Sequence, residues 1–338
     1  MIINILKHGN EKLKEIRSVK RFKSSGNCYP NRPLLIATVN FWKTAFKNDF
    51  LDYLLTRVTD GNHEYVRRIE QADIIFSSVF GSKKSDPHRT IFYTGENIRP
   101  DFKKCAYSLS FEQDSWVGRN FYTPFWYSRI AWPGFITRGP TRKKDRPHLY
   151  ENLIEVESLT SARQAVSFQD RNRFCAIIAS NPETLRLNLA RELSAYKPVD
   201  GYGRAFGEPL HASKFDTLKK YRFCLCPEND IWPGYVTEKL FDAWAAGTIP
   251  IYCGLPNKDS ELNRDAYVNY LDFMSAEEVI RRVVELDSNE DLFNRTYTKP
   301  LLLKPPRLEP LVHFLRESIE SILKNAGHTF ATGDALEE

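Results

Sequence analysis

The sequence contains no long apolar run and no segment typical of export. No stretch of about 18 consecutive apolar residues occurs, the minimum for a helix that spans a bilayer, so we expect no transmembrane helix. Residues 1–8 are too short and become polar too soon to form a secretory signal peptide. We therefore expect a cytoplasmic protein. A Golgi-lumenal domain trimmed of its membrane anchor would look similar and stays an alternative, and peripheral membrane contact also stays open.

Metal-binding patterns are also lacking. The six cysteines have no paired spacing of the kind that binds zinc, and several lie in apolar runs, where free cysteine packs as a small core residue. Their even number permits disulfides but does not require them in a chain of 338 residues. None of the seven histidines pairs with another at ligand spacing. The sequence therefore indicates no structural metal and leaves disulfide formation open.

Positively charged residues outnumber negatively charged ones only moderately. The net charge of +5 and the pI of about 8.7 suit a phosphate-bearing ligand or weak attraction to an anionic membrane. They fall far short of the dense basic surface of a nucleic-acid-binding protein, so we expect no nucleic-acid partner. The basic runs at 12–23 and 142–146 are typical of solvated surface. With 42% apolar and 27% charged residues the chain is globular in composition, and 338 residues suffice for two domains.

Short β-rich apolar runs alternate with helical patterns, which predicts mainly parallel sheets. The predicted strands of the first half are 34–40, 73–80, 90–94 and 105–111, with a helix at 46–58. Those of the second half are 174–180, 221–227 and 248–252, with helices at 185–196, 214–220, 236–246 and 307–324. Asn181 and Pro182 are candidates for the start of the helix at 185–196, and Gly247 is a candidate C-terminal cap.

A stretch from Ala131 to about Tyr150, rich in proline, glycine, lysine and arginine, separates the two series of elements. It predicts a domain boundary, with a first domain at 1–160, a second at 161–325 and a loose tail at 326–338. Two β/α/β series of this kind predict an α/β protein with two Rossmann-like domains that face each other across a cleft.

The segment from Pro227 to Leu240 joins a predicted strand to a predicted helix, so it lies at the carboxyl edge of a sheet, where open α/β folds bind ligands. The helix begins near Thr237, and its N-terminus offers free N–H groups to a phosphate. Lys239 in the first turn is unfavourable for the helix dipole unless an anion compensates it, which hints at function. Glu238 could equally be an ordinary first-turn acid, and Lys239 a surface residue.

A resemblance to a known family rests on more than thirty residues around this segment. They run Tyr221-Arg-Phe-Cys-Leu-Cys-Pro-Glu-Asn229, then Gly234-Tyr-Val-Thr-Glu-Lys-Leu-Phe-Asp-Ala243, then Gly247-Thr-Ile-Pro-Ile-Tyr-Cys-Gly254. With its spacings intact, this stretch resembles the motif of the α-1,3-fucosyltransferases of glycosyltransferase family 10, in the bacterial type. It departs from the family at Pro227, where phenylalanine is usual, and in the spacer Asp230–Gly234, which carries Trp232.

Two upstream segments extend the resemblance to roughly residues 34–273. Phe92-Tyr-Thr-Gly-Glu-Asn97 is similar to the segment of the bacterial members that holds the proposed catalytic base, which implies that Glu96 is the base. Ala179-Ser-Asn-Pro182, followed by Arg186, is similar to the segment whose arginine contacts the donor diphosphate. The resemblance implies a GT-B architecture with the acceptor on the first domain and GDP-fucose on the second. The heptad repeats of some bacterial members have no counterpart here.

Fucosyl transfer with inversion suits these residues chemically. A base must take the proton of the acceptor hydroxyl, and Glu96, which follows a strand and a glycine, can face a cleft. Arg186 and Lys239 would compensate the charge of the departing diphosphate. Further donor-binding candidates are Glu238, which would accept hydrogen bonds from sugar hydroxyls, and Tyr235 and Asn229, which would shape the GDP-fucose pocket.

Other interpretations of the same residues stay open. Glu96 could be a surface turn residue, Arg186 a solvated helix arginine, and Asn229 an ordinary turn residue. No Asp-x-Asp pattern stands in a convincing loop, and two cationic side chains can do the work of a divalent ion. We therefore expect no obligatory metal cofactor, although a divalent cation could stimulate the reaction.

The resemblance thus predicts inverting transfer of L-fucose from GDP-fucose to an oligosaccharide acceptor, with the family's usual preference for the 3-hydroxyl of N-acetylglucosamine in an N-acetyllactosamine-like acceptor. The alternatives are a related GT-B transferase with another sugar-nucleotide donor and a catalytically silent nucleotide-sugar-binding module. Aromatic residues that could stack on acceptor sugars, or equally pack in the core, are Trp42, Trp116, Phe121, Trp126 and Tyr127.

Overall fold

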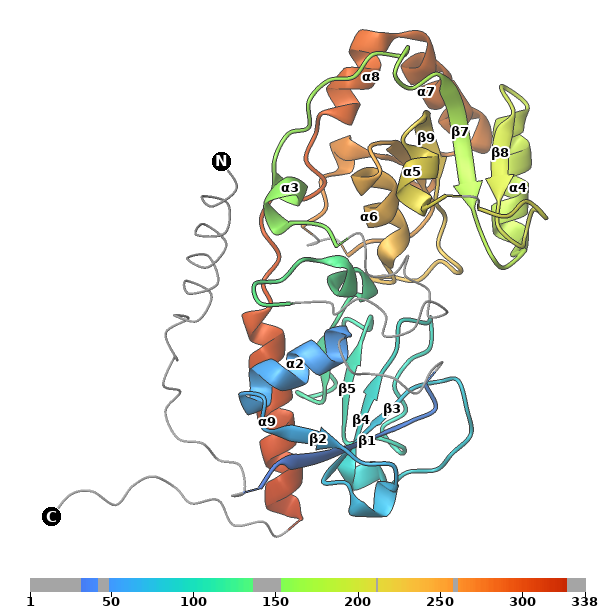
Figure 1. Ribbon diagram of the computed structural model, residues 1–338. Helices are drawn as coiled ribbons and strands as arrows, with labels where there is room; N and C mark the ends of the chain where they lie inside the picture. Colours follow the sequence, from blue (N-terminus) through green and yellow to red (C-terminus); the bar gives the residue numbers. More distant parts are fainter. Residues whose placement is uncertain (1–31, 42–48, 136–152, 211, 258–260, 327–338) are drawn as a thin grey trace, which may run out of the picture.

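The computed structural model describes residues 32–41, 49–135, 153–210, 212–257 and 261–326. These residues form two α/β halves, one below the other in Figure 1, with the blue-to-green half at the bottom and the yellow-to-orange half at the top. Within the described ranges, no helix is long and apolar enough to cross a membrane. The basic runs at 12–23 and 142–146 lie outside the described residues.

The first half is built on a parallel sheet whose inner strands are buried. Its strands are β1 (Leu34–Val39), β2 (His63–Tyr65), β3 (Ile74–Ser77), β4 (Thr90–Tyr93), β5 (Tyr107–Ser110) and β6 (Asn120–Tyr122), in the order β2-β1-β3-β4-β5-β6. The strands predicted from sequence are confirmed as β1, β3, β4 and β5. The two edge strands escaped prediction because each has only three residues and is mostly not buried. Helix α2 (Phe50–Thr59), capped by the Asp49 carboxylate, confirms the described part of the predicted helix at 46–58.

The second half is built on another parallel sheet. Its strands are β7 (Arg173–Ile178), β8 (Val199–Tyr202), β9 (Tyr221–Leu225), β10 (Ile249–Tyr252) and β11 (Val268–Asn269), in the order β11-β10-β9-β7-β8. Its helices are α4 (Thr184–Ser194), α5 (Lys214–Leu218), α6 (Glu238–Ala245), α7 (Ala276–Ser288) and α8 (Glu290–Tyr297), and the short α3 (Val156–Thr160) precedes them. All the strands and helices predicted for this half are present, while β8, β11, α7 and α8 were not predicted.

Of the two helix ends predicted from the sequence, one is confirmed and the other is wrong. Gly247 directly follows the last residues of α6 and has a φ of +77°, so the predicted C-terminal glycine is confirmed. The predicted start at Asn181 is wrong, because α4 begins at Thr184 after Glu183. Asn181 instead lies in the loop that leaves β7, where its carbonyl oxygen accepts a hydrogen bond from the Arg186 guanidinium at 3.3 Å.

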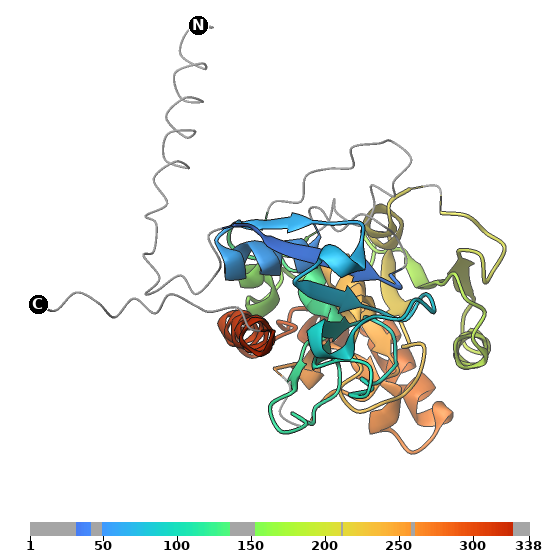
Figure 2. The same ribbon diagram turned by 90° about the horizontal axis from the view of Figure 1, so that it is seen from below.

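The last described helix, α9 (Glu309–Asn325), returns to the first half. It runs beside the first sheet in Figure 1 and is seen end-on at one side of that sheet in Figure 2. The Tyr107 hydroxyl on β5 donates to Ser321 Oγ at 2.8 Å, and the rings of Phe121 and Phe314 lie 5.4 Å apart. The helix therefore packs with the first sheet, although residues 161–325 are predicted from the sequence to form one domain. Its amphipathic pattern predicts a helix but not the sheet that its apolar face covers.

A short 3-10 helix, η4 (Phe125–Arg129), joins the first half to the second. The Trp126 ring stacks on Phe241 of α6, with centroids 4.2 Å apart and planes at 12°. Arg129 Nε is 3.0 Å from the Asp242 carboxylate, and both side chains are almost fully buried. Lys214 Nζ contacts the other oxygen of the same carboxylate at 2.7 Å. The Trp126–Phe241 stack and the Arg129–Asp242 ion pair hold α6 against the first half, while Lys214 joins α5 to α6 within the second half.

Candidate functional site

A small cavity opens at the carboxyl ends of β7 and β9. The connection from β7 runs to β8 on one side, and the connection from the adjacent strand β9 runs to β10 on the other, so the chain leaves these two strands in opposite directions. Such a switch point is where open α/β sheets bind ligands. The polar side chains in the cavity wall are Arg186, Lys214, Lys239 and Asp242, and Pro227 also lines it. The cavity therefore lies at the edge of the sheet where the sequence places its donor site.

A fully buried carboxylate, Glu228, organises the start of α6. It accepts hydrogen bonds from the Thr237 backbone N–H and from the Thr237 hydroxyl, both at 2.7 Å. It also accepts from the Tyr252 hydroxyl at 3.0 Å and from Lys239 Nζ at 3.0 Å. A charge this deeply buried is tolerated only when it is hydrogen-bonded and paired, and all four donors meet that need. Glu228 thus ties the end of β9 to the N-terminus of the next helix.

Sequence reasoning gave Glu228 no role, although the residue stands inside the family motif. The missed signal was its place: an acidic residue three positions beyond a buried strand and directly before Asn229. Thr237 was correctly predicted at the start of the helix, where it is the N-cap of α6. Its hydroxyl does not cap the helix but donates to Glu228. That arrangement depends on tertiary structure, so the local sequence pattern cannot predict it.

Lys239 lies in the first turn of α6, as predicted. A positive charge in the first turn is unfavourable for the helix dipole unless an anion compensates it. In the structure, the Glu228 carboxylate is that anion. Lys239 Nζ also donates to the Thr237 hydroxyl at 2.9 Å. Burial would lower the pKa of Lys239, but the carboxylates of Glu228 and Glu238 outweigh burial and raise that pKa. The lysine therefore stays charged at the cavity wall, held in a fixed place by its partner.

Arg186 and Asn229 were predicted separately and are in direct contact. The Arg186 guanidinium donates to the Asn229 side-chain oxygen, which joins α4 to the loop after β9. Only 6% of Arg186 is exposed. Among the described residues no carboxylate pairs with this guanidinium, so its positive charge is not neutralised by the protein there. An unneutralised, buried arginine is suited to bind an anion such as a diphosphate.

Tyr235 lies almost completely buried where the two halves meet. Its ring packs edge-on against Phe111, with centroids 5.2 Å apart. Burial raises the pKa of the Tyr235 hydroxyl, and the carboxylates of Glu228, Glu96 and Glu238 raise this pKa further. Carboxylates from both halves therefore act on the Tyr235 hydroxyl. The predicted base Glu96 thus lies close enough to Tyr235 to influence it electrostatically.

Glu238 is half-buried at the first position of α6. Burial would raise the pKa of the Glu238 carboxyl, but the nearby charges of Lys239 and Lys214 outweigh burial and lower that pKa. The carboxylate form is therefore the one present near neutral pH, and it can accept hydrogen bonds from a ligand hydroxyl.

Glu96 follows β4 at the carboxyl edge of the first sheet. Its backbone N–H donates to the Thr94 hydroxyl at 3.1 Å, which starts a turn. Gly95 presses against Phe125 of η4, because a Cβ at Gly95 would come within 2.4 Å of that ring. In the part of the chain that the structure describes, the half-buried Glu96 carboxylate has no hydrogen bond or ion pair. It is thus free to bind a ligand.

The described aromatic candidates for acceptor stacking are either packed in the core or exposed. Trp126 and Phe121 pack against Phe241 and Phe314, and Tyr127 packs against Trp126 and Trp132, so these three serve the core. Trp116 is 44% exposed and contacts Phe102, with centroids 5.5 Å apart. Trp42 lies outside the described residues. Trp116 is therefore the one described candidate with a free face.

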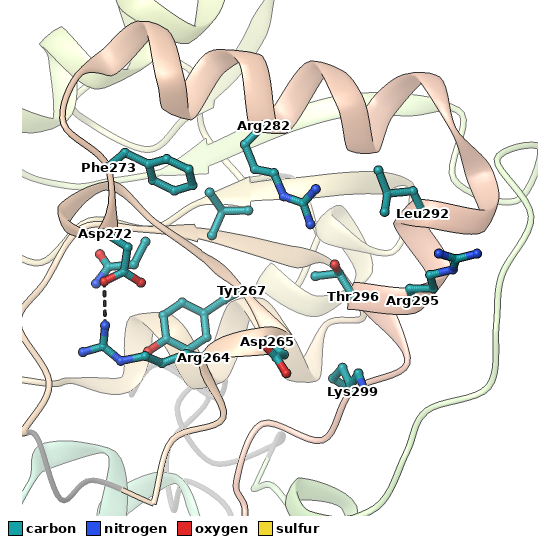
Figure 3. A pocket seen from close by; sticks show the side chains of 12 residues that line it. Arg264, Asp265, Tyr267, Asp272, Phe273, Arg282, Leu292, Arg295, Thr296 and Lys299 are labelled. Carbon is teal, nitrogen blue, oxygen red and sulfur yellow. Dashed lines mark hydrogen bonds and ion pairs between the residues drawn. The ribbon is translucent and has the colours of Figure 1, made fainter.

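A second cavity lies at the outer edge of the second sheet. Figure 3 shows it among residues of β11, α7, α8 and the loop before β11, with Arg264 paired to Asp272 at 2.6 Å. Arg282, Arg295 and Lys299 add positive charge to its wall. None of the predicted site residues lines it, and β10 separates it from β9. This cavity is not part of the candidate site.

Among the described residues no cluster of three His, Cys, Asp or Glu side chains could hold a metal.

Two family models match the chain. The C-terminal model of glycosyltransferase family 10 (fucosyltransferase) matches residues 168–299, and the model of the alpha-(1,3)-fucosyltransferase FucT N-terminal domain matches residues 36–128. Together they cover about two thirds of the chain. The first match contains Arg186 and the segment from Asn229 to Lys239, and the second contains Glu96.

Curated relatives agree with these matches. Alpha-(1,3)-fucosyltransferase FucT of Helicobacter pylori is 30% identical over 294 residues, which are 80% of this chain and 60% of that protein. The 4-galactosyl-N-acetylglucosaminide 3-alpha-L-fucosyltransferase 9 of Homo sapiens is 32% identical over 123 residues, 35% of this chain and 34% of that protein. The chain therefore spans 60% of the length of its bacterial relative and about a third of the mammalian one.

Solved structures confirm the fold. A crystal structure of an alpha1,3-fucosyltransferase with GDP-fucose superposes with a TM-score of 0.63 at 21% identity, covering 88% of this chain and 93% of that one. A structure of an alpha1,3-fucosyltransferase with GDP gives a TM-score of 0.62 at 22% identity, covering 88% and 94%. With two parallel sheets in the described residues, this likeness confirms the predicted α/β fold of GT-B type.

Proposed function

This chain belongs to glycosyltransferase family 10, and from that premise we propose that it transfers L-fucose from GDP-fucose to a hydroxyl of an oligosaccharide acceptor. The observation that carries the proposal is the convergence of Arg186 and Lys239 on one cavity at the switch point of the second sheet. A guanidinium without a carboxylate partner and a helix N-terminus both favour a diphosphate there.

The proposed reaction is a single displacement with inversion at the anomeric carbon of fucose. The Glu96 carboxylate takes the proton of the acceptor hydroxyl while the acceptor oxygen forms its bond to that carbon. The bond from the carbon to the diphosphate oxygen breaks, and GDP leaves with its charge balanced by Arg186 and Lys239. A diphosphate is a good leaving group, so the mechanism needs no second carboxylic acid, in contrast to inverting glycosidases.

The donor residues have separate tasks in this proposal. Glu238 accepts hydrogen bonds from fucose hydroxyls, because its carboxyl stays ionised beside Lys239 and Lys214. Asn229 is held by Arg186 and fixes the direction of that guanidinium. Tyr235, buried between the halves, forms a wall near both Glu96 and the donor.

We expect donor choice to separate this proposal from its alternatives. GDP-fucose should bind to the intact chain at least about tenfold more tightly than GDP-mannose or a UDP-sugar, a difference of about 1.4 kcal/mol. Isothermal titration with each sugar nucleotide measures the difference. Tighter binding of another donor would favour a related transferase, and tight GDP-fucose binding without transfer to any acceptor would favour a silent binding module.

The acceptor is proposed to be an N-acetyllactosamine-like oligosaccharide modified at the 3-hydroxyl of N-acetylglucosamine. The support is the name of one relative, which describes 3-fucosylation of a 4-galactosyl-N-acetylglucosaminide. A transfer assay on a glycan array with GDP-fucose, followed by linkage analysis of the product, tests this. A product linked at another hydroxyl, or strong transfer only to glycans that lack N-acetylglucosamine, would contradict it.

We propose that transfer needs no obligatory metal, because two cations of the protein face the diphosphate. Full chelation with EDTA should therefore leave more than about half of the activity, and added Mg²⁺ or Mn²⁺ should stimulate the enzyme no more than a few-fold. Initial rates with and without chelator measure the effect. Complete loss in EDTA with recovery on adding Mn²⁺ would show that a metal carries part of the charge compensation.

A further inference from the structure

The spacer Asp230–Gly234 of the donor motif reaches across to the first half of the molecule. The Asn97 side-chain amide donates to the Asp230 carboxylate. The Arg99 guanidinium lies over the Trp232 ring, 3.4 Å from its centroid. At the end of the spacer, the Tyr122 hydroxyl of β6 donates to the Gly234 carbonyl at 3.1 Å. These contacts join the donor motif to the first sheet, at the loop that follows β4 and at the last residue of β6.

Close packing fixes the far end of the spacer. Gly234 has a φ of +82°, and a Cβ there would come within 2.9 Å of the Phe111 carbonyl oxygen and 2.8 Å of the Asn257 side-chain oxygen. Its N–H donates to the Leu255 carbonyl at 2.8 Å. Any larger residue at Gly234 would push the spacer away from the first half, so its place is set by backbone on both sides.

The partners of the spacer are the neighbours of the predicted base. Asn97 directly follows Glu96, and Arg99 comes two residues later. The turn is tight, because the Ile98 N–H donates to the Glu96 carbonyl at 2.7 Å. Arg99 is held from the other side as well, since its Nε lies 3.2 Å from the Glu112 carboxylate. Fixing Asn97 and Arg99 therefore fixes the backbone of Glu96.

We propose that Asp230 and Trp232 are positioning residues that set the Glu96 loop relative to the donor site. The proposal rests on the proposed function, and it explains why the spacer, a departure from the family pattern, carries a bulky tryptophan. A cation over an indole face is attracted to the ring, which favours one loop conformation. Placement within less than about 1 Å matters, because a misplaced catalytic group can lower the rate about 10²-fold.

A purely structural role for these contacts predicts something different. If they only joined the two halves, their loss would lower stability and donor affinity together and would leave the turnover of bound substrate unchanged. If they position Glu96, their loss lowers kcat and leaves GDP affinity and thermal stability nearly unchanged.

The test compares Trp232→Ala with Trp232→Phe and with a matched control. Trp232→Ala should lower kcat about 10–100-fold with the Kd for GDP changed less than about threefold, and Trp232→Phe, which keeps a ring under Arg99, should recover most of the rate. Phe168→Ala removes a similar contact, with Arg222 over the ring at 4.7 Å, away from the junction and should keep wild-type kcat. Wild-type kcat in Trp232→Ala, or equal losses of kcat and GDP affinity, would overturn the proposal.

A second measurement does not depend on the proposed reaction. Amide hydrogen exchange of residues 94–99 should speed up in Trp232→Ala and in Asp230→Ala, while the strands of the second sheet keep their protection. Asp230→Asn, which keeps an acceptor oxygen for Asn97, should exchange as the wild type does. If wild-type protein transfers no fucose, the proposed function fails, and unchanged exchange at 94–99 in Trp232→Ala is what would sink the positioning role.

Discussion

Glu96→Gln is expected to lower the rate of fucosyl transfer about 10²–10⁴-fold and to leave GDP affinity unchanged. The substitution keeps the size of the side chain but removes its ability to take a proton. The carboxylate is half-buried after β4 and, among the described residues, has no hydrogen bond or ion pair to lose, so the fold should not suffer. Steady-state transfer rates with GDP-fucose and titration calorimetry with GDP measure the two effects.

The control for this substitution is a carboxylate on the same half but away from the junction. Glu70 lies on the exposed 3-10 helix η2 (Ile69–Gln71), and Glu70→Gln should keep the wild-type rate. The result that contradicts the assignment is a Glu96→Gln enzyme with normal kcat, because another group would then take the acceptor proton. A rate loss matched by an equal loss of GDP affinity would instead place Glu96 in donor binding.

Glu228→Ala is expected to lower the free energy of unfolding by about 3–5 kcal/mol and to remove measurable GDP binding. Without the carboxylate, the half-buried Lys239 ammonium loses its ion partner. The Thr237 N–H and hydroxyl and the Tyr252 hydroxyl lose their acceptor as well. The start of α6 should then loosen, because these bonds fix its first turn to β9. Urea denaturation and calorimetry with GDP measure stability and binding.

A double-mutant cycle shows whether the loss comes from the unpaired lysine. Lys239→Met alone and Glu228→Gln alone each leave one buried polar partner unsatisfied, whereas Glu228→Gln with Lys239→Met removes both charges. We expect the double variant to be more stable than the sum of the single effects predicts, by about 0.5–3 kcal/mol. Strict additivity would mean that the Glu228–Lys239 contact at 3.0 Å contributes nothing specific.

The predictable parts of the fold were those with strong local signals. The buried strands β1, β3, β4, β7, β9 and β10 are mostly apolar runs, and pattern alone finds such runs. Edge strands such as β2 carry no such run, because only the pairing with β1 makes His63–Tyr65 a strand. The start of α4 was misplaced because asparagine and proline favour helix starts but do not exclude an extended loop.

The residues of the candidate site could be proposed one by one from the sequence, but the contacts between them could not. Local sequence put Glu238 and Lys239 in the first turn of a helix, and the family resemblance pointed to Glu96 and Arg186. Nothing local indicates that Arg186 donates to Asn229 or that Lys239 is paired with Glu228. These contacts join residues that lie 43 and 11 positions apart, and only the packing of α4 and α6 against the end of β9 brings them together.

The return of α9 to the first sheet sets an order for folding during synthesis. The apolar face of this helix, with Leu311, Leu315, Ile319 and Ile322, is buried in a core that includes Leu54 and Leu109 of the first half. The first half is therefore made early but lacks its cover until residue 325 has left the ribosome. The second sheet has all its strands and its helices α4–α8 by residue 297 and can close sooner. Until α9 emerges, the growing chain presents an uncovered apolar sheet face, a surface of the kind that chaperones bind and that aggregation exploits.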